Sequence, residues 1–235
     1  MGEKLNIHGR AQTKYAENYI IFPTSCQVLP FCLRLTLRCG TMGTRIFCEE
    51  AAAVLGGQVK KIALDGIFSA VGTIPVAELQ YSQEVRAACE KNICRGYGAT
   101  WACPPAVGTV AACRERVEQY DTMLLFSRCY QLEDSFDFEG MMESLLDFKK
   151  RVDVFAENLP PQLSDYLLLS NEGCHRCEKC TYPAAPCRFP EKLYHALEGY
   201  GFLVSGLASQ AGIPYHNGAN TVTYFGALLF RDTDE

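Results

Sequence analysis

Apolar residues recur along the chain at two different spacings, and the longest helical pattern covers residues 138–158. An apolar side chain returns there every three or four residues, which places one continuous apolar stripe on a helix. Asp137 can cap the start of this helix, and Pro160 with Pro161 prevents its continuation. The stripe is formed by Met141, Leu145, Phe148, Val152 and Phe155.

Uninterrupted apolar runs predict the strands. Residues 122–129, 166–169 and 221–230 have this character, and the last run follows an Asn217-Gly218 dipeptide, which is typical of a tight turn. These three segments are therefore expected to form the interior of a sheet.

A fourth strand is expected at residues 59–64. It would follow a helix over residues 45–55 that ends at Gly56 and Gly57, because glycine commonly terminates helices. The chain between this strand and Ser82 contains glycines and is not assigned to any element.

Three further helices complete the pattern. Ser82 is a suitable N-cap for a helix that leads directly into Cys89. A second helix is expected over residues 109–119, and a third, rich in small residues, over residues 200–210.

Helices that alternate with strands give a βαβ-type order. We therefore expect an α+β fold with a mixed or antiparallel sheet, helices on one face and two cysteine-rich metal loops, and a ferredoxin-like arrangement is the specific candidate. A doubly wound α/β sheet is the alternative, because periodicity does not reveal the direction in which strands pair.

The first 41 residues differ from the rest of the chain. They carry a net positive charge, whereas the whole chain has a net charge of −5. Residues 1–41 are therefore expected to be an N-terminal extension, mobile or outside the native domain. Residues 42–235 are expected to form a single cysteine-rich metal-binding domain.

The composition narrows the class of protein. The 13 cysteines are an odd number, and no signal peptide or long apolar run precedes them, so a reducing cytoplasm is expected and a disulfide scaffold or membrane span is not. With 22 basic and 27 acidic residues, the chain lacks the cationic character of a nucleic-acid-binding protein.

The strongest chemical signal is a cysteine-rich loop near the C-terminus. Cys174, Cys177, Cys180 and Cys187 have the spacing Cys-x2-Cys-x2-Cys-x6-Cys, and Pro190 follows. In bacterial ferredoxins a Cys-x2-Cys-x2-Cys loop binds three corners of a four-iron cluster. Backbone amides turned inward would donate hydrogen bonds to the sulfur atoms, and Cys187 could supply the fourth corner.

Zinc is the main alternative, because four cysteines also complete a tetrahedral structural site. Zinc sites usually take two separated pairs, however, whereas three of these cysteines crowd one loop. A set of thiols without metal is the third interpretation. Covalent haem is excluded, because no cysteine pair ends in Cys-His.

A second set of four cysteines lies earlier in the chain. Cys89, Cys94, Cys103 and Cys113 have a looser spacing, so their ligation of a second cluster is a weaker expectation. The simpler interpretation is that Cys89 and Cys113 are buried thiols on helices, which is common for free cysteine.

The residues between these cysteines strengthen the case for a metal. Gly96 and Gly98 permit the tight backbone that a cluster requires. Tyr97 and Trp101 would shield the site from water, and His175, in the other loop, is a further candidate for the surroundings of a cluster.

The motifs CRGYGATWACPP, GCHRCEKCTYPAAPCRFP and NGANTVTYFGALLF together resemble an uncharacterised prokaryotic family, domain of unknown function 2284, described as predicted metal-binding proteins. The resemblance covers residues 42–231 and implies metal binding through cysteines, without an assigned reaction. Arg95 departs from the family, which usually places glycine directly after the cysteine. Residues 1–41 fall outside the resemblance.

Two histidines and the remaining cysteines are weaker candidates for a functional role. His195 is expected on a helix surface, and His216 is the one candidate general acid should a substrate bind. The remaining cysteines lack ligand spacing and are expected not to bind metal: Cys26, Cys32, Cys39, Cys48 and Cys129.

Three functions follow from these observations. The leading hypothesis is an iron-sulfur protein with one or two 4Fe-4S clusters that transfers electrons to a redox partner protein. The second is a zinc-stabilised interaction module. The third is a cluster-dependent enzyme that acts on a small molecule near His216 and Tyr224.

Overall fold

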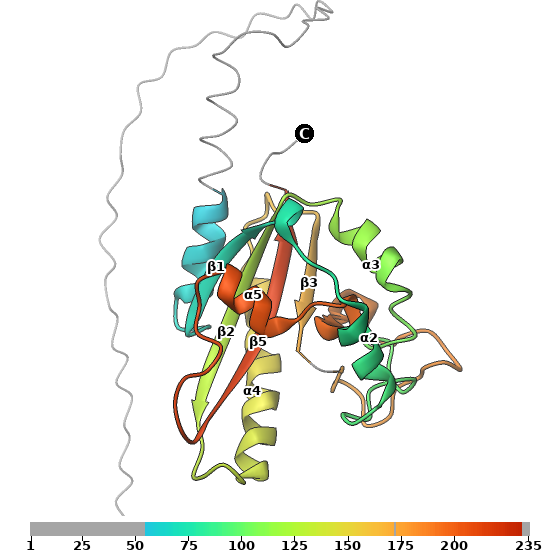
Figure 1. Cartoon of the computed structure of the whole chain (residues 1–235). Helices are drawn as coiled ribbons and strands as arrows, with labels where there is room; N and C mark the ends of the chain where they lie inside the picture. The colour runs from blue at the N-terminus through green and yellow to red at the C-terminus, as the bar shows by residue number, and fades with distance from the viewer. Residues whose placement is uncertain (1–54, 172, 232–235) are drawn as a thin grey trace, which may run out of the picture. The chain divides into compact units, whose positions relative to one another are not determined.

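The computed structural model describes residues 55–171 and 173–231 (Figure 1). The expected extension over residues 1–41 and nearly all of the expected helix over residues 45–55 lie outside the described residues. So do Cys26, Cys32, Cys39 and Cys48.

Within the described residues, five strands form one mixed sheet in the order β1-β2-β5-β3-β4. The pairs β1–β2, β2–β5 and β5–β3 are antiparallel, and β3–β4 is parallel. The mixed sheet and the α+β class confirm the expected fold class. The strands are β1 (Ala70–Pro75), β2 (Thr122–Gln131), β3 (Tyr166–Ser170), β4 (His195–Ala196) and β5 (Thr221–Phe230).

The long helix α4 (Phe138–Glu157) connects β2 to β3. Because β2 and β3 are both antiparallel to β5, which lies between them, they run parallel to each other. The segment is thus a split βαβ unit, a feature of ferredoxin-like folds, and it confirms the βαβ-type order.

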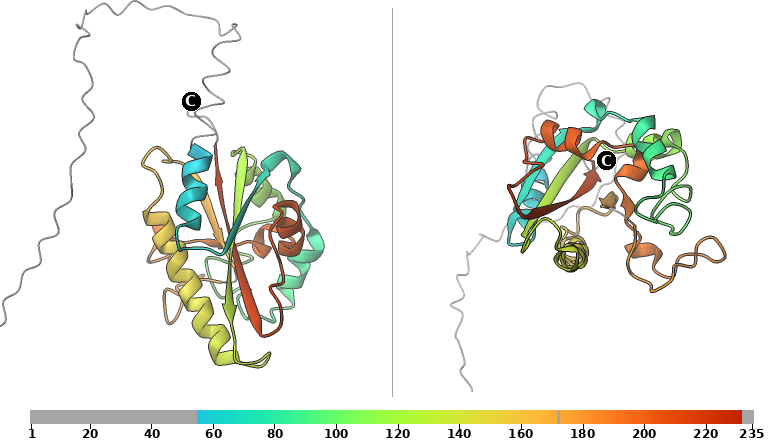
Figure 2. Two further views of the ribbon diagram at one scale, coloured as in Figure 1. Left: turned by 90° about the vertical axis from the view of Figure 1, so that its left-hand side faces the viewer. Right: turned by 60° about the horizontal axis from the view of Figure 1, so that its bottom comes forward.

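Helices cover both faces of the sheet, so the expectation of helices on one face is wrong. On the α4 face, Phe148 and Val152 of α4 pack against Phe126 together with helical residues 55–64. On the opposite face, Leu207 of α5 (Val204–Gln210) packs with Leu125. Figure 2 shows these two layers. Successive side chains of a strand point to opposite faces of the sheet. Apolar side chains lie on both faces here, so each face must be buried by other elements.

Two short helices flank the first group of cysteines and begin where the sequence predicts. In α2 (Gln83–Glu90), the Ser82 hydroxyl accepts a hydrogen bond from the Val85 amide. In α3 (Val110–Val117), the Thr109 hydroxyl accepts one from the Ala112 amide. Three single-turn 3-10 helices complete the described elements: η1 (Val76–Glu78), η2 (Pro190–Lys192) and η3 (Glu198–Tyr200).

The strand expected at residues 59–64 is wrong, because residues 55–64 are helical and Gly56 and Gly57 lie inside the helix. Val59 and Ala63 are fully buried and lie four residues apart, which is helical spacing. The apolar run was short enough to suit either structure.

The strand β1 was not predicted, and α5 begins later than expected. Gly72 interrupts the apolar run in the sequence of β1. Its lack of a side chain lets the end of α5 approach, because a Cβ there would lie 2.1 Å from the Ala211 carbonyl oxygen. Tyr200 belongs to η3, and Gly201 with φ 81° separates it from α5.

No helix among the described residues is both long and apolar enough to cross a membrane.

Candidate metal centre

Two cysteine-bearing loops emerge from different parts of the fold and contact each other. The first cysteine loop, residues 89–109, joins α2 to α3, and the second, residues 173–189, follows β3. The Trp101 indole N–H donates to the Ala185 carbonyl at 3.1 Å, and its ring meets Tyr182 edge-on at 4.8 Å. Trp101 therefore joins the two loops.

The four cysteines of the second loop line one hollow. Cys174, Cys177, Cys180 and Cys187 are each half-buried there, and Trp101 closes one side. The spacing predicted that these four cysteines lie together. The shielding role expected of Trp101 stays a prediction.

Backbone amides of the second loop point toward its sulfur atoms. The Phe189 amide donates to Cys187 Sγ at 3.4 Å. Burial raises the pKa of Cys174, while a hydrogen bond from the Arg176 amide and the charges of Arg176 and Lys149 lower it. Such amides stabilise thiolates, the form in which cysteine binds metal.

The first loop brings two sulfur atoms against one glycine. A Cβ at Gly96 would lie 3.0 Å from Cys103 Sγ and 3.6 Å from Cys94 Sγ, so these sulfurs are no farther apart than the sum of the two distances. Any side chain at residue 96 would fill this cradle.

Electrostatics link a third cysteine to this pair. Burial raises the pKa of Cys103 to about 11, with a smaller raising effect from Cys94 and Cys89 and a lowering hydrogen bond from Thr100. Burial also raises the pKa of Cys89, followed by Glu198. A bound cation would offset these costs, because metal binds the deprotonated sulfur.

Cys113, the fourth member expected for this set, has different neighbours. It is fully buried on α3, its Sγ lies 3.5 Å from the Val107 carbonyl oxygen, and Arg116 donates to it at 3.2 Å. Burial raises the pKa of Cys113, and Arg116 and Arg86 lower it. The structure thus brings Cys94 and Cys103 against Gly96, leaves Cys89 linked to Cys103 by electrostatics alone, and places Cys113 beside arginines.

The two sets of cysteines adjoin at Gly173. A Cβ on Gly173 would lie 3.5 Å from Cys103 Sγ, and the next residue in the chain is Cys174. Sequence spacing cannot reveal this proximity, because the two cysteines are separated by α3, β2, α4 and β3.

The structure also places the two other residues expected near a cluster, Tyr97 and His175. Tyr97 is half-buried, and its amide donates to the Asn92 side chain at 3.0 Å. His175 is exposed and faces a separate pocket beside α4. Lys149, which sequence reasoning missed, also lines that pocket. The available signal was its position within Lys149-Lys150-Arg151 on an otherwise amphipathic helix.

The expectation for His195 is wrong. It lies in β4, not on a helix surface, and its Nδ1 is 2.9 Å from the Tyr200 hydroxyl. Burial, followed by the charge of Arg116, lowers the pKa of His195 to about 4.

His216 and Tyr224 do not form the small-molecule site that was considered. His216 contacts Tyr215, which stacks on Phe225, whereas the Tyr224 hydroxyl donates to the Met141 carbonyl on the α4 face. Phe225 and Tyr224 are consecutive in β5, so they point to opposite faces.

Within residues 55–171 and 173–231, no three histidine, cysteine or acidic side chains converge tightly enough to hold a single metal ion. A zinc ion needs four thiolates at about 2.3 Å from one centre. The thiolates of a four-iron cluster bind separate irons around a larger core.

Comparison with known proteins identifies a family. The model of a family described as "Predicted metal-binding protein (DUF2284)" matches residues 72–230, which include both cysteine loops. No curated protein and no solved structure matches the chain. The chain therefore belongs to the DUF2284 family of predicted metal-binding proteins.

Proposed function

We propose that the protein binds one or two 4Fe-4S clusters and transfers electrons to a redox partner protein in the cytoplasm. The observation that carries this proposal is the hollow lined by all four cysteines of the second loop and walled by Trp101. Amides directed at Cys174 and Cys187 add support, because they lower the cost of the negative charge on thiolates.

The residues divide the work between two sites. Cys174, Cys177, Cys180 and Cys187 hold one cluster, and the first loop holds a second with Cys89, Cys94, Cys103 and Cys113 as candidate ligands. A bound cluster supplies one-electron chemistry. Of the second set, Cys113 has the least support, because its described contacts are with Val107 and Arg116.

Two neighbouring cluster sites favour electron transfer over a structural role. Gly173 lies against Cys103 and precedes Cys174, so the two sites share a wall of the protein. Trp101 is one of the residues that line the hollow, and the hydrophobic surroundings of a cluster help to set its potential.

The experiment compares two cysteine variants of anaerobically purified protein. Cys177→Ala removes a ligand from the hollow and should abolish the visible absorption of this cluster that dithionite bleaches, which is about half of the total if both sets are occupied and all of it if only this set is. Cys129→Ala, in β2 and half-buried outside both loops, should leave it unchanged. A colourless wild-type protein that unfolds when zinc is chelated would overturn the proposal in favour of a zinc-stabilised module.

A further inference from the structure

The helix α4 and the turn before it expose a row of apolar side chains. Phe136 and Phe138 are 80% and 72% exposed, and Met142 and Leu146 are also exposed. Because Phe138, Met142 and Leu146 are spaced by four residues, they follow one side of the helix over about 12 Å. We call the four residues the α4 stripe. Exposed apolar side chains that gather in this way mark a surface for another molecule.

The turn that carries Phe136 is ordered by hydrogen bonds. The Asp134 carboxylate accepts one from the Phe136 amide at 2.7 Å. The Asp137 carboxylate accepts another from the Glu133 amide at 3.2 Å, and the Phe138 amide donates to the Phe136 carbonyl at 2.8 Å. The backbone that presents Phe136 is therefore fixed before a partner arrives, which lowers the entropy cost of binding.

Acidic side chains border the α4 stripe. Residues 131–148 carry six acidic side chains and no basic one. Asp137 caps α4, and Asp147 pairs with Arg151. An apolar centre of aromatic and methionine side chains within a polar rim is the usual composition of a protein interface. The four remaining acidic residues are exposed: Glu133, Asp134, Glu139 and Glu143.

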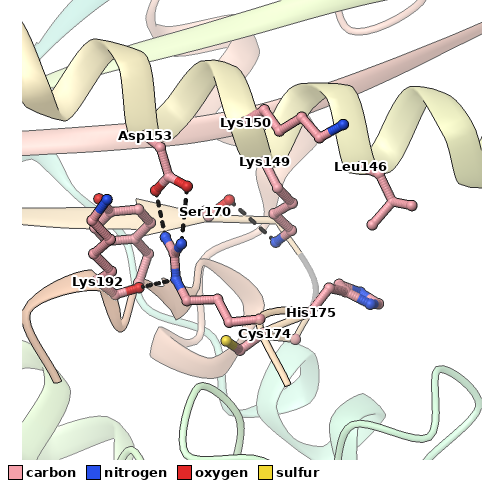
Figure 3. A pocket seen from close by; sticks show the side chains of 11 residues that line it. Leu146, Lys149, Lys150, Asp153, Ser170, Cys174, His175 and Lys192 are labelled. Carbon is pink, nitrogen blue, oxygen red and sulfur yellow. Dashed lines mark hydrogen bonds and ion pairs between the residues drawn. The ribbon is translucent and has the colours of Figure 1, made fainter. Parts of the chain in front are cut away.

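The α4 stripe leads to the second cysteine loop. Asp153 follows Leu146 by seven residues, about two helical turns, so both lie on the same side of α4. The Asp153 carboxylate accepts two hydrogen bonds from the guanidinium of Arg176 in that loop, one at 2.9 Å. Figure 3 shows Leu146 above Cys174 and His175, and the three residues line a common pocket. A protein docked on the stripe would therefore lie beside this loop.

We propose that the α4 stripe is the docking surface for the redox partner, and that this partner presents an apolar patch bordered by lysine and arginine side chains. The inference rests on the proposed function, because the partner exchanges electrons with the cluster of the second loop. Opposite charges at the two rims steer the encounter of the proteins. The small size of the stripe suits this partner, since electron-transfer complexes bury less than about 1,200 Å².

A second copy of this chain suits the stripe less well. In a symmetric dimer the same surface of both subunits meets, so Glu139 and Glu143 would approach the same acidic rim on the other copy. Like charges that face each other oppose such a contact. Four exposed side chains also supply little of the roughly 1,600 Å² that a standard stable interface buries.

Binding is measured first, because it needs no cluster. Ferric cytochrome c, a small haem protein with a basic surface, is titrated calorimetrically into the anaerobically purified full chain at an ionic strength of about 0.1 M. Binding should be saturable and should weaken as salt is added. Glu139→Gln together with Glu143→Gln should weaken it about tenfold.

The matched control removes the same two charges elsewhere. Glu78→Gln with Glu115→Gln replaces exposed carboxylates of η1 and α3. It should change the affinity by less than about twofold, because exposed charges farther away than the Debye length are screened.

Met142→Gln tests the apolar part of the stripe. It keeps the length of the side chain and should weaken binding about fivefold, because less apolar surface is buried. Leu64→Gln is its control, since Leu64 is 47% exposed and lies outside the stripe. It should leave the affinity unchanged.

Electron transfer is then followed by stopped flow. One electron leaves the dithionite-reduced cluster and reduces the ferric haem iron of cytochrome c to ferrous iron. At concentrations below saturation, the rate should fall in both stripe variants in parallel with affinity. The rate with benzoquinone, a small neutral oxidant that accepts one electron to give its semiquinone, should stay unchanged.

The outcomes separate the docking surface from the cluster. Binding that responds to the stripe variants without any electron transfer supports the surface and overturns the proposed function. Binding that both stripe variants leave unchanged overturns the docking proposal, even where the cluster is present. Sedimentation of the wild type as a dimer that Met142→Gln converts to a monomer also overturns it, because the stripe would then belong to a second copy.

Discussion

At the scale of single residues, glycine decides how closely backbone can approach the sulfur atoms. The sequence marks Gly96 and Gly98 alike as sites of tight backbone, but the structure separates them. Gly98 supplies a left-handed turn at φ +66° with open space around it, whereas Gly96 lies against Cys94 and Cys103. The sequence predicts that a glycine is needed for a tight backbone near the cysteines. Only the fold shows that Gly96, and not Gly98, lies against the sulfur atoms.

Gly96→Ala should impair the first site alone. The added methyl would lie 3.0 Å from Cys103 Sγ, closer than ordinary contact, so the sulfur must move. We expect iron and sulfide per chain to fall by about half, because the second loop keeps its ligands. Gly57→Ala is the matched control, since it adds the same methyl where nothing lies within 4 Å. Full metal content in Gly96→Ala would refute the role of the cradle.

His195 should make the folded protein sensitive to acid. Its pKa is lowered from 6.5 to about 4, so between these values the unfolded chain binds a proton that the folded protein excludes. His195 therefore does not reduce the free energy of unfolding above pH 6.5. As the pH falls toward 4, its burial lowers that free energy progressively, by at most about 3 kcal/mol. Urea unfolding at pH 7 and pH 5 measures this effect. His195→Asn should show a smaller loss between the two pH values, and an identical loss would exclude His195 as the cause.

At the scale of helices and strands, the sequence pattern predicted the features that neighbouring residues determine, such as helix caps. The caps at Ser82 and Asp137 form as expected, and the Asp137 carboxylate accepts a hydrogen bond from the Gly140 amide at 2.8 Å. The prediction failed at residues 59–64, where a short apolar run suited strand and helix equally. Packing against the α4 face decides that segment, and packing is a tertiary interaction.

The contact of β1 with the end of α5 can be tested by Gly72→Ala. A Cβ at residue 72 would clash with the backbone carbonyl of Ala211, which cannot move without shifting the end of the helix. Overpacking of this kind costs about 1–3 kcal/mol. The urea midpoint should fall.

Gly206→Ala, in the middle of α5, provides the contrast. Its added methyl meets only ordinary contacts from 3.8 Å outward, so it should stabilise by about 0.5–1 kcal/mol. Equal effects of the two substitutions would show that the close approach at Gly72 is not limiting.

At the scale of the whole molecule, the fold brings two distant cysteine loops together. Trp101 and Ala185 are joined by a hydrogen bond across 84 residues of sequence, and the Ala196 amide donates to the Ala102 carbonyl at 2.9 Å. The grouping of four cysteines around one hollow could be predicted from spacing, because its members share one loop: Cys174, Cys177, Cys180 and Cys187. For Cys113, the simpler interpretation of a buried thiol on a helix agrees with the structure. The effect of Arg86 on it could not be predicted, because Arg86 belongs to another helix, α2.

The central claim is that these loops hold iron-sulfur clusters, and quantitative iron, acid-labile sulfide and zinc analysis of anaerobically purified protein tests it most directly. We expect about four irons and four sulfides per chain for each occupied set, hence about eight of each when both are filled. Stoichiometric zinc without sulfide would contradict it.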